Sequence, residues 1–217
     1  MSCRARRYAS ISLAVVLVAG VQVGCGDKDD AKKNKAGDKT KGKTDAPTAW
    51  YAAPLVAQTP GKVYIFRFKI SIPKGLNPWG KQHGMFKWGV DKKWESLMAK
   101  PGEVRVTVHD TTEAKPGPEE AKAAYEKIIG SDASKHRLIG SGAAKGGYWI
   151  ATAQRVDDLW NLGYTRTILA GGGLKKSGVY CEVELHVKSA AFPDAETKKF
   201  MSGAKRICAT LERLPNK

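Results

Sequence analysis

The sequence lacks the short motifs that mark common catalytic and metal sites. Its four histidines (His83, His109, His136 and His186) are scattered, and neither HxH nor HExxH occurs. GxSxG and CxxC are also absent, although catalytic serines and paired thiol ligands often occur in those spacings. We therefore expect no catalytic residue, no metal site and no cofactor, and we interpret the protein as a non-enzyme.

Two weaker candidates for chemistry remain. His109 and Asp110 are adjacent at the end of a predicted strand, where they could act as an acid–base pair. Glu182, Glu184 and His186 alternate along another predicted strand, and such positions could supply ligands for a hard metal ion. A solvated face of an antiparallel sheet explains the second pattern more simply.

Acidic residues are scarce relative to basic ones. The chain has 21 Asp and Glu against 37 Lys and Arg, giving a net charge of +16. The three arginines of the leader account for +3 of this charge, and residues 26–47, with seven lysines and five aspartates, account for +2. Residues 48–217 therefore carry a net charge of +11. Such a charge favours anionic partners, namely phospholipid headgroups, envelope polysaccharide or acidic proteins, and it also serves general solubility.

Only one long apolar run occurs, Tyr8–Val23, and Arg4, Arg6 and Arg7 precede it. A basic segment, a short apolar run and small residues before a cleavage site are typical of a secretory signal peptide. The run is slightly shorter than the roughly 17–25 residues of a membrane-spanning helix. An ordinary cleaved signal and a retained membrane helix are the alternatives to a lipoprotein signal.

The end of this run, Val23-Gly24-Cys25, resembles the lipobox of bacterial lipoproteins. The resemblance implies removal of residues 1–24 and attachment of diacylglycerol to the Cys25 thiol. Gln22 departs from the pattern, because Leu is usual at that position. Gly26, rather than Asp, implies an outer-membrane location in a bacterium with two membranes. We expect a lipid-anchored envelope protein, with a soluble secreted or periplasmic protein as the alternative, and no nucleic-acid partner.

The four cysteines have separate predicted fates. Cys3 leaves with the leader, and Cys25 is the predicted lipidation site. Cys181 and Cys208 then remain together in an oxidising compartment, where a pair of cysteines usually forms a disulfide. Cys181 lies in phase with the apolar residues of a predicted strand, and Cys208 lies beside the apolar stripe of the last predicted helix. We predict a disulfide between them.

Residues 26–47 contain no large apolar side chain. Such a segment cannot offset its ordering entropy, so we predict that 25–47 is a disordered tether and 48–217 a folded domain. Alternating and apolar segments predict strands at Val63–Ile72, Met85–Val90, Glu103–His109, Arg137–Gly142, Gly147–Gln154, Tyr164–Ala170 and Val179–Val187. Helices are predicted at Pro118–Ile129 and from Pro193 onward, with a short one around Trp94.

This order of elements predicts an α+β fold in which helices pack on one antiparallel sheet. It resembles the PsbP-like fold of photosystem II extrinsic subunits, a yeast Ran-binding protein and LpqN-type lipoproteins. The resemblance covers most of 60–214 and is carried by the strand ending in Ile72-Pro73-Lys74-Gly75, the helix Pro118–Ile129 and the closing helix. It implies an α/β/α sandwich and a binding or scaffold module.

Aromatic and basic residues indicate where such a module would bind its partner. Trp79 lies in a predicted loop-rich region and Trp160 in a predicted loop at Arg155–Leu162, and exposed tryptophans often anchor interfaces. The basic residues expected around Trp79 are Lys74, Lys81, Lys87, Lys92 and Lys93. We predict a partner protein or an anionic envelope component as the ligand. The alternatives are a carrier with an apolar pocket between helix and sheet, and a hydrolase with an unrecognised site.

Overall fold

The computed structural model describes residues 50–82, 84–90, 100–130, 132, 134–171 and 177–215, and only the backbone of 80–82. The chain divides into two compact units, Met1–Gly42 and Lys43–Lys217, and all described residues belong to the second. The predictions for Cys25, the tether, Lys92, Lys93 and the short helix around Trp94 lie outside these residues, as does the side chain of Lys81.

The described elements alternate in the order that the sequence indicates, with several short strands added. They are β1 (Leu55–Ala57), β2 (Gly61–Val63), β3 (Phe66–Lys69), β4 (Ser71–Pro73), β5 (Asn77–Gln82), β6 (Met85–Gly89), β7 (Val104–Thr111), α1 (Pro118–Ile129), β8 (His136–Ala144), β9 (Gly147–Val156), β10 (Leu159–Leu169), β11 (Gly178–Lys188), α2 (Asp194–Ala209) and β12 (Glu212–Leu214).

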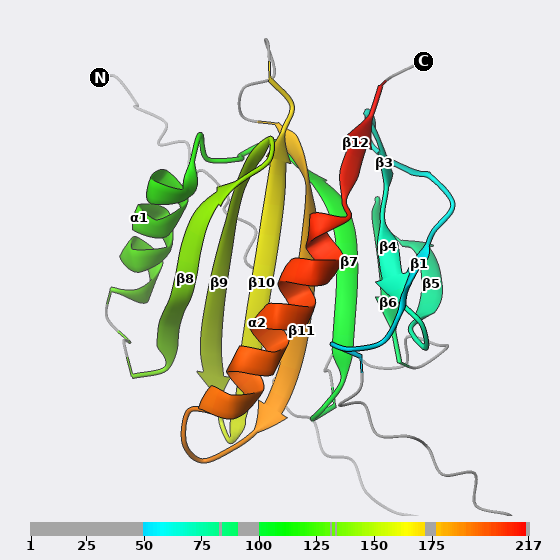
Figure 1. Ribbon diagram of the computed structural model, residues 1–217. Coiled ribbons are helices and arrows are strands. Elements are labelled where there is room, and N and C mark those ends of the chain that lie inside the picture. The colour runs from blue at the N-terminus through cyan, green and yellow to red at the C-terminus, as the bar shows by residue number, and fades with distance from the viewer. Residues whose placement is uncertain are drawn as a thin grey trace, which may run out of the picture. The chain divides into compact units, whose positions relative to one another are not determined.

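Seven of the described strands form one antiparallel sheet in the order β5-β6-β7-β11-β10-β9-β8 (Figure 1). Strands β8 to β11 pair with their neighbours in sequence, whereas β7 pairs with the distant β11. Two small sheets, β1-β4 and β12-β3-β2, complete the strand pairing of the described residues. The predicted α+β fold class is confirmed.

Helix α2 crosses one face of the large sheet, over β10 and β11. Its apolar stripe is almost completely buried, and comprises Phe200, Ala204, Ile207, Cys208 and the following Leu211. Each large side chain buried in this way contributes about 1.5–3 kcal/mol to folding. The predicted disulfide between Cys181 on β11 and Cys208 is confirmed, with Cα atoms 5.5 Å apart. It fixes α2 to the centre of the sheet.

Helix α1 has the predicted bounds, with Pro118 in its first turn and Gly130 directly after its end. It packs on β8 and β9, where the Tyr125 hydroxyl hydrogen-bonds to Thr152. Thr152 lies between Ala151 and Ala153, which are buried on the α2 face, so its own side chain points to the opposite face. The two helices therefore cover opposite faces, as the predicted sandwich requires.

The predicted strand Val63–Ile72 is broken into three short strands. Tyr64 has a left-handed backbone (φ 47°) and forms a two-residue turn with Ile65 between β2 and β3. A left-handed residue ends the pairing of a straight strand. The apolar alternation nevertheless holds after the turn, because Phe66, Phe68, Ile70 and Ile72 are buried, while Tyr64 is 70% exposed.

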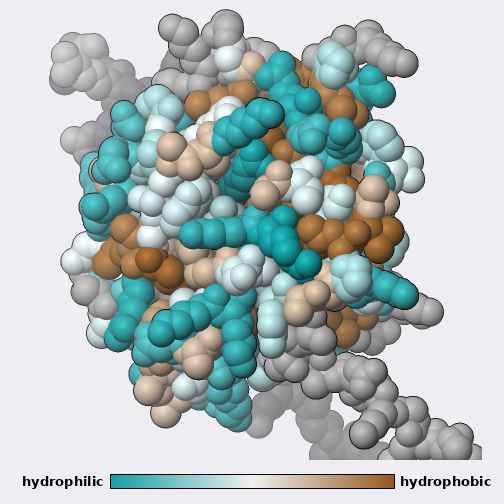
Figure 2. All heavy atoms as spheres, in the orientation of Figure 1, coloured by the Kyte–Doolittle hydropathy of each residue, from teal (hydrophilic) through white to brown (hydrophobic). Residues whose placement is uncertain are grey.

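The face that carries α2 shows several separate hydrophobic patches among hydrophilic side chains (Figure 2). Figure 2 shows no single broad apolar area on this face. Among the described residues, no helix is both long and apolar enough to span a membrane. The large apolar side chains are instead gathered between the sheet, α2 and the small sheets, where the main core lies.

Candidate anion-binding site

The predicted partner surface is brought together only in part. Trp79 is half-buried on β5, and its ring lies over Gly89, where a Cβ atom would come within 2.1 Å of the ring. The Arg105 guanidinium lies 5.6 Å from the centre of that ring. Lys87 is on the same face of the sheet, opposite to α2. Lys74 is exposed in the turn after β4.

Trp160 does not fit the predicted role of an exposed anchor. The predicted loop Arg155–Leu162 is a hairpin that turns at Asp157 and Asp158, and Trp160 already belongs to β10. Its side chain is 3% exposed and packs edge-on against Phe192, with ring centres 5.1 Å apart. Trp160 is therefore a core residue of the α2 face. Trp88 of β6 is also buried.

Carboxylates share the face of Trp79 and Lys87, so this face is not purely basic. We call the group Lys87, Arg105, His109, Glu182, Glu184 and His186 the ionisable cluster; its members lie on β6, β7 and β11 in matching register. Burial raises the pKa of Glu182 to about 8 and also raises that of Glu184. Burial lowers the pKa of His109 to about 4, and also lowers those of Lys87 and His186.

Glu182, Glu184 and His186 are partly exposed on this face, and burial is the main cause of each pKa shift. The His109 Nε2 atom is 3.9 Å from a Glu182 carboxylate oxygen, too far for a hydrogen bond. Its Nδ1 atom lies 3.1 Å from the Asp110 carbonyl. No group of His, Cys, Asp and Glu in the described part of the chain is arranged to hold a metal ion.

A more distinctive arrangement lies on the α2 face, around Arg166 of β10. This side chain is only 7% exposed. Its Nη1 atom donates to the carbonyls of Cys208 (2.6 Å) and Leu211 (3.1 Å), and its Nη2 atom donates to that of Lys145 (3.1 Å). Because the carbonyls at a helix C-terminus carry partial negative charge, this end of α2 compensates part of the guanidinium charge.

A guanidinium has five N–H groups, and these bonds use three of them. Within the described residues, the Nε–H and one Nη2–H of Arg166 have no hydrogen-bond partner. Burial lowers the pKa of Arg166. Its Nε atom is not among the fully buried polar atoms that lack a partner in the described residues, so this donor remains accessible to water or to a ligand.

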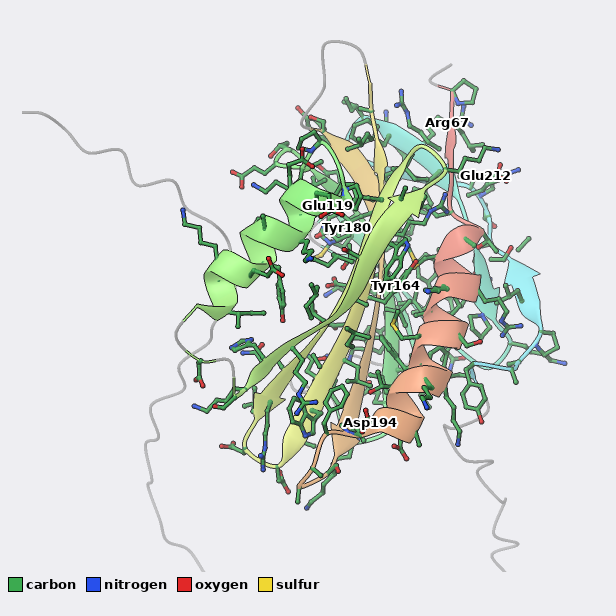
Figure 3. All side chains as sticks on the ribbon, turned by 60° about the vertical axis from the view of Figure 1, so that its left-hand side comes forward. Arg67, Glu119, Tyr164, Tyr180, Asp194 and Glu212 are labelled. Atoms are coloured by element: carbon green, nitrogen blue, oxygen red, sulfur yellow. A yellow bond between two sulfur atoms is a disulfide. The ribbon has the colours of Figure 1, made fainter. Side chains whose placement is uncertain are left out.

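Arg166 lines a pocket of about 310 Å³, together with Ala144, Lys145, Tyr164, Lys205 and Ala209. Tyr164 lies between the sheet and α2 (Figure 3). Its hydroxyl makes no hydrogen bond to another described residue, and burial raises its pKa to about 12. The phenol is therefore protonated at neutral pH and can donate a hydrogen bond into the pocket.

The wall beside this pocket is built by an aromatic stack. Trp149 of β9 stacks on Tyr164 with ring centres 5.7 Å apart, and the Lys205 Nζ atom lies 4.4 Å from the centre of the Trp149 ring. Gly140 and Gly142 of β8 leave room for this indole, because a Cβ at either position would come within 3.2 Å of it. These glycines therefore serve packing within strand β8.

No carboxylate is among the described residues that line the pocket. The acid with an electrostatic effect on Arg166 is Glu212 of β12, which is paired with Lys69 at 2.9 Å. The labels in Figure 3 place Glu212 beyond the C-terminal end of α2. Three basic residues and one tyrosine thus line one concavity, with no acid among its described lining residues, and this arrangement can bind an anion.

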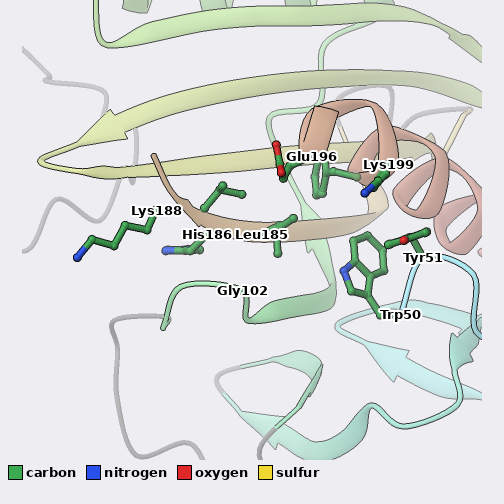
Figure 4. A pocket seen from close by; sticks show the side chains of 10 residues that line it. Trp50, Tyr51, Gly102, Leu185, His186, Lys188, Glu196 and Lys199 are labelled. Atoms are coloured by element: carbon green, nitrogen blue, oxygen red, sulfur yellow. The ribbon is translucent and has the colours of Figure 1, made fainter. Parts of the chain in front are cut away.

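A second pocket, of about 170 Å³, lies at the other end of α2 (Figure 4). Trp50, Tyr51 and Phe200 supply aromatic walls, and Leu185 and Val187 supply aliphatic ones. Lys188, Lys199, Glu196 and His186 contribute the polar part of the lining, and Gly102 completes it. This is the apolar pocket between helix and sheet that a carrier requires.

Sequence patterns contain part of the information for the anion pocket. Arg166 is in phase with Leu162, Tyr164 and Ile168 on β10, so the alternation places a charged residue on the apolar face of its strand. A charge at such a position is a useful indication of a site, because buried charges need partners. Lys145 and Lys205 carry no comparable pattern, since exposed lysines are common.

No protein-family model and no curated protein matches this chain. Among solved structures, the chain is similar to the Saccharomyces cerevisiae Ran-binding protein Mog1p. The two are 8% identical, the superposition covers 73% of this chain and 96% of that chain, and the TM-score is 0.49. This similarity concerns the arrangement of helices and strands alone.

Proposed function

We propose that this protein is a non-enzymatic binding module of the bacterial envelope, tethered by a lipid on Cys25, and that it recognises an anionic envelope component. The observation that carries the proposal is the pocket lined by Lys145, Tyr164, Arg166 and Lys205 together with two alanines, with no carboxylate among its described lining residues. The net charge of +11 on 48–217 adds long-range attraction for anions.

The proposed location depends on the leader and on Cys25. A triacylated Cys25 would hold the domain at a membrane without a spanning helix, because each buried acyl methylene contributes about 0.8 kcal/mol and several chains anchor firmly. The polar segment 26–47 would then separate the domain from the lipid. An outer-membrane position is favoured by Gly26, with a soluble periplasmic or secreted protein as the alternative.

The tether is tested by the intact mass of the protein purified from a membrane fraction. A chain that begins at Cys25 and carries acyl mass supports the proposal, and Cys25→Ala should release the protein from the membrane. A chain without lipid that begins at another residue would contradict it. Reduction of the same sample should add the mass of two protons, because it opens the Cys181–Cys208 disulfide.

Anion recognition is tested separately, with the Cys25→Ala chain and vesicles. We expect sedimentation with vesicles that contain phosphatidylglycerol, none with phosphatidylcholine alone, and loss of binding at high salt, which screens charge. Equal sedimentation with both vesicle types would overturn an anionic ligand. Capture of a specific envelope protein, unaffected by anionic lipid, would instead support the partner-protein alternative.

The pocket in Figure 4 favours a second candidate function, the binding of a small apolar molecule. Its volume of about 170 Å³ is close to that of an apolar cavity of about 150 Å³ that binds benzene. The pocket therefore suits one ring or a short branched chain rather than a whole acyl chain. Indole or toluene should perturb the NMR signals of Trp50, and Leu185→Phe, which fills the pocket, should abolish the effect.

A further inference from the structure

We infer that the pocket between β10 and the C-terminal half of α2 binds a phosphate group, held by the free N–H groups of Arg166, the Tyr164 hydroxyl and the ammonium groups of Lys145 and Lys205. This inference rests on the proposed function, since it names the chemistry of the anion that the same pocket recognises. It does not depend on lipid attachment, because all four residues lie within the described domain.

Arg166 provides the fixed part of the site. Three hydrogen bonds to carbonyls orient its guanidinium, so binding an anion does not require the ordering of a flexible arginine. The unused donors, the Nε–H and one Nη2–H, are on adjacent nitrogens of one planar group. Arginine binds two oxygens of a phosphate or carboxylate through such pairs of donors.

The other donors come from different directions and favour a tetrahedral anion. Tyr164 is two residues before Arg166 on the same strand, Lys145 lies in the turn between β8 and β9, and Lys205 is on α2. A flat carboxylate offers two oxygens and one negative charge. A phosphate monoester offers three terminal oxygens and a charge near −2 at neutral pH, which better matches three cations and a hydroxyl.

The size of the pocket bears on the source of the phosphate. The pocket has a volume of about 310 Å³, far above the roughly 10–15 Å³ that one water molecule needs by the same kind of measure. A phosphate that is part of a larger molecule could therefore enter it as well as free phosphate. Free phosphate and the headgroup of a phosphorylated envelope lipid both present charged phosphate oxygens. The experiment below distinguishes these two sources.

The experiment is a titration of the full-length chain, followed by NMR or calorimetry, with inorganic phosphate, glycerol 3-phosphate and acetate. We expect saturable binding of both phosphates, weaker binding of acetate, and the tightest binding for glycerol 3-phosphate if a headgroup is the natural ligand. Tyr164→Phe and Lys205→Gln should each weaken phosphate binding about fivefold, the effect of losing roughly 1 kcal/mol.

Lys198→Gln is the matched control, because Lys198 is also an exposed lysine of α2 but does not line the pocket. It should change the affinity less than twofold. Equal losses for Lys198→Gln and Lys205→Gln would show that general positive charge attracts the anion, and would overturn the site. Near-ultraviolet circular dichroism checks that Tyr164→Phe remains folded.

The outcomes also separate this inference from the proposed function. Binding of anionic vesicles by a chain that does not bind phosphate or glycerol 3-phosphate would overturn the phosphate site and leave the proposed function in place. Binding of phosphate without any retention on anionic vesicles would support the site and contradict recognition of an envelope membrane surface. Acetate binding as tight as phosphate binding would overturn the preference for a tetrahedral anion.

Discussion

The Arg166 guanidinium donates a hydrogen bond of 2.6 Å to the carbonyl oxygen of Cys208, the residue whose sulfur is bonded to Cys181. One residue of α2 is thus attached to β10 through its backbone and to β11 through its side chain. The last turn of the helix is held at two adjacent strands. The backbone and the side chain of Cys208 therefore hold α2 against the sheet and also fix the position of Arg166, which lines the anion pocket.

Arg166→Met should strongly destabilise the fold. The substitution removes a donor from three carbonyls; that of Cys208 keeps the Leu211 N–H as a donor, and a buried acceptor left without a partner costs about 1–3 kcal/mol. We expect a loss of about 2–3 kcal/mol in the free energy of unfolding, measured with urea. Arg166→Lys should also be destabilising, because an ammonium group cannot span the same carbonyls. A loss below about 1 kcal/mol for the methionine variant would contradict the structural role.

Removal of the disulfide should also lower stability. Cys181 and Cys208 are separated by 27 residues, and closing a loop of this length contributes about 3.5 kcal/mol in the chain-entropy model. The double variant Cys181→Ala/Cys208→Ala should show this loss in urea unfolding, and reduction of the wild type should approach the same value. Unchanged unfolding after complete reduction would argue against this contribution.

Stability should fall between about pH 6.5 and 8 because of Glu182. The pKa of this carboxyl is about 8 in the folded protein and 4.5 ordinarily, so its contribution is complete below 4.5 and is lost as the pH rises through 8. The slope should be well below 1.4 kcal/mol per pH unit, since the side chain is 33% exposed and water screens it. Glu182→Gln should flatten the profile, unlike Glu126→Gln on the exposed side of α1.

His109 should oppose this effect under acidic conditions. Its pKa is about 4 in the folded protein and 6.5 ordinarily, so its contribution is present above pH 6.5 and is lost as the pH falls through 4. The effects of Glu182 and His109 on the pH dependence of stability are opposite in sign and should partly cancel between about pH 4.5 and 6.5. His109→Gln should therefore make the protein relatively more stable as acid is added, and an unchanged acid profile would contradict the burial of His109.

A double-mutant cycle tests the contact between Trp79 and Gly89. A Cβ at position 89 would lie 2.1 Å from the Trp79 ring, so Gly89→Ala should cost about 1–3 kcal/mol by overpacking. The same substitution should cost much less in a Trp79→Ala background, where the ring is absent. Equal costs in the two backgrounds would show that the indole does not lie over Gly89 in solution.

Local patterns predicted the helices and the sheet well. Pro118 and Gly130 bracket α1 because proline and glycine have clear roles at helix ends, and the apolar stripe of α2 is buried as expected. Helix α1 is less completely buried, since Ile128 is 51% exposed. This helix covers only β8 and β9 among the described strands, so part of its surface has no sheet to contact.

The structure departs from the sequence-based predictions at single backbone positions and in contacts between residues that are distant in the sequence. The positive φ angle of Tyr64 places a turn where the side chains give little indication of one, and that of Asp157 confines the predicted loop to a tight turn. The second of these turns brings Trp160 into a strand and then into the core. The anion pocket combines residues that are up to about 60 positions apart, from Lys145 to Lys205, and no local pattern can bring them together.

The position of β11 between β10 and β7 determines the order in which the sheet can fold. Strands β8 to β11 pair with sequence neighbours, whereas the pairs between β7 and β11 join residues 67 to 81 positions apart. Such distant pairing closes large loops and is slow. β11 must form before β7 can join the sheet, and until then it presents an open edge to other chains. Aggregation during folding should therefore be most sensitive to how long that edge remains uncovered.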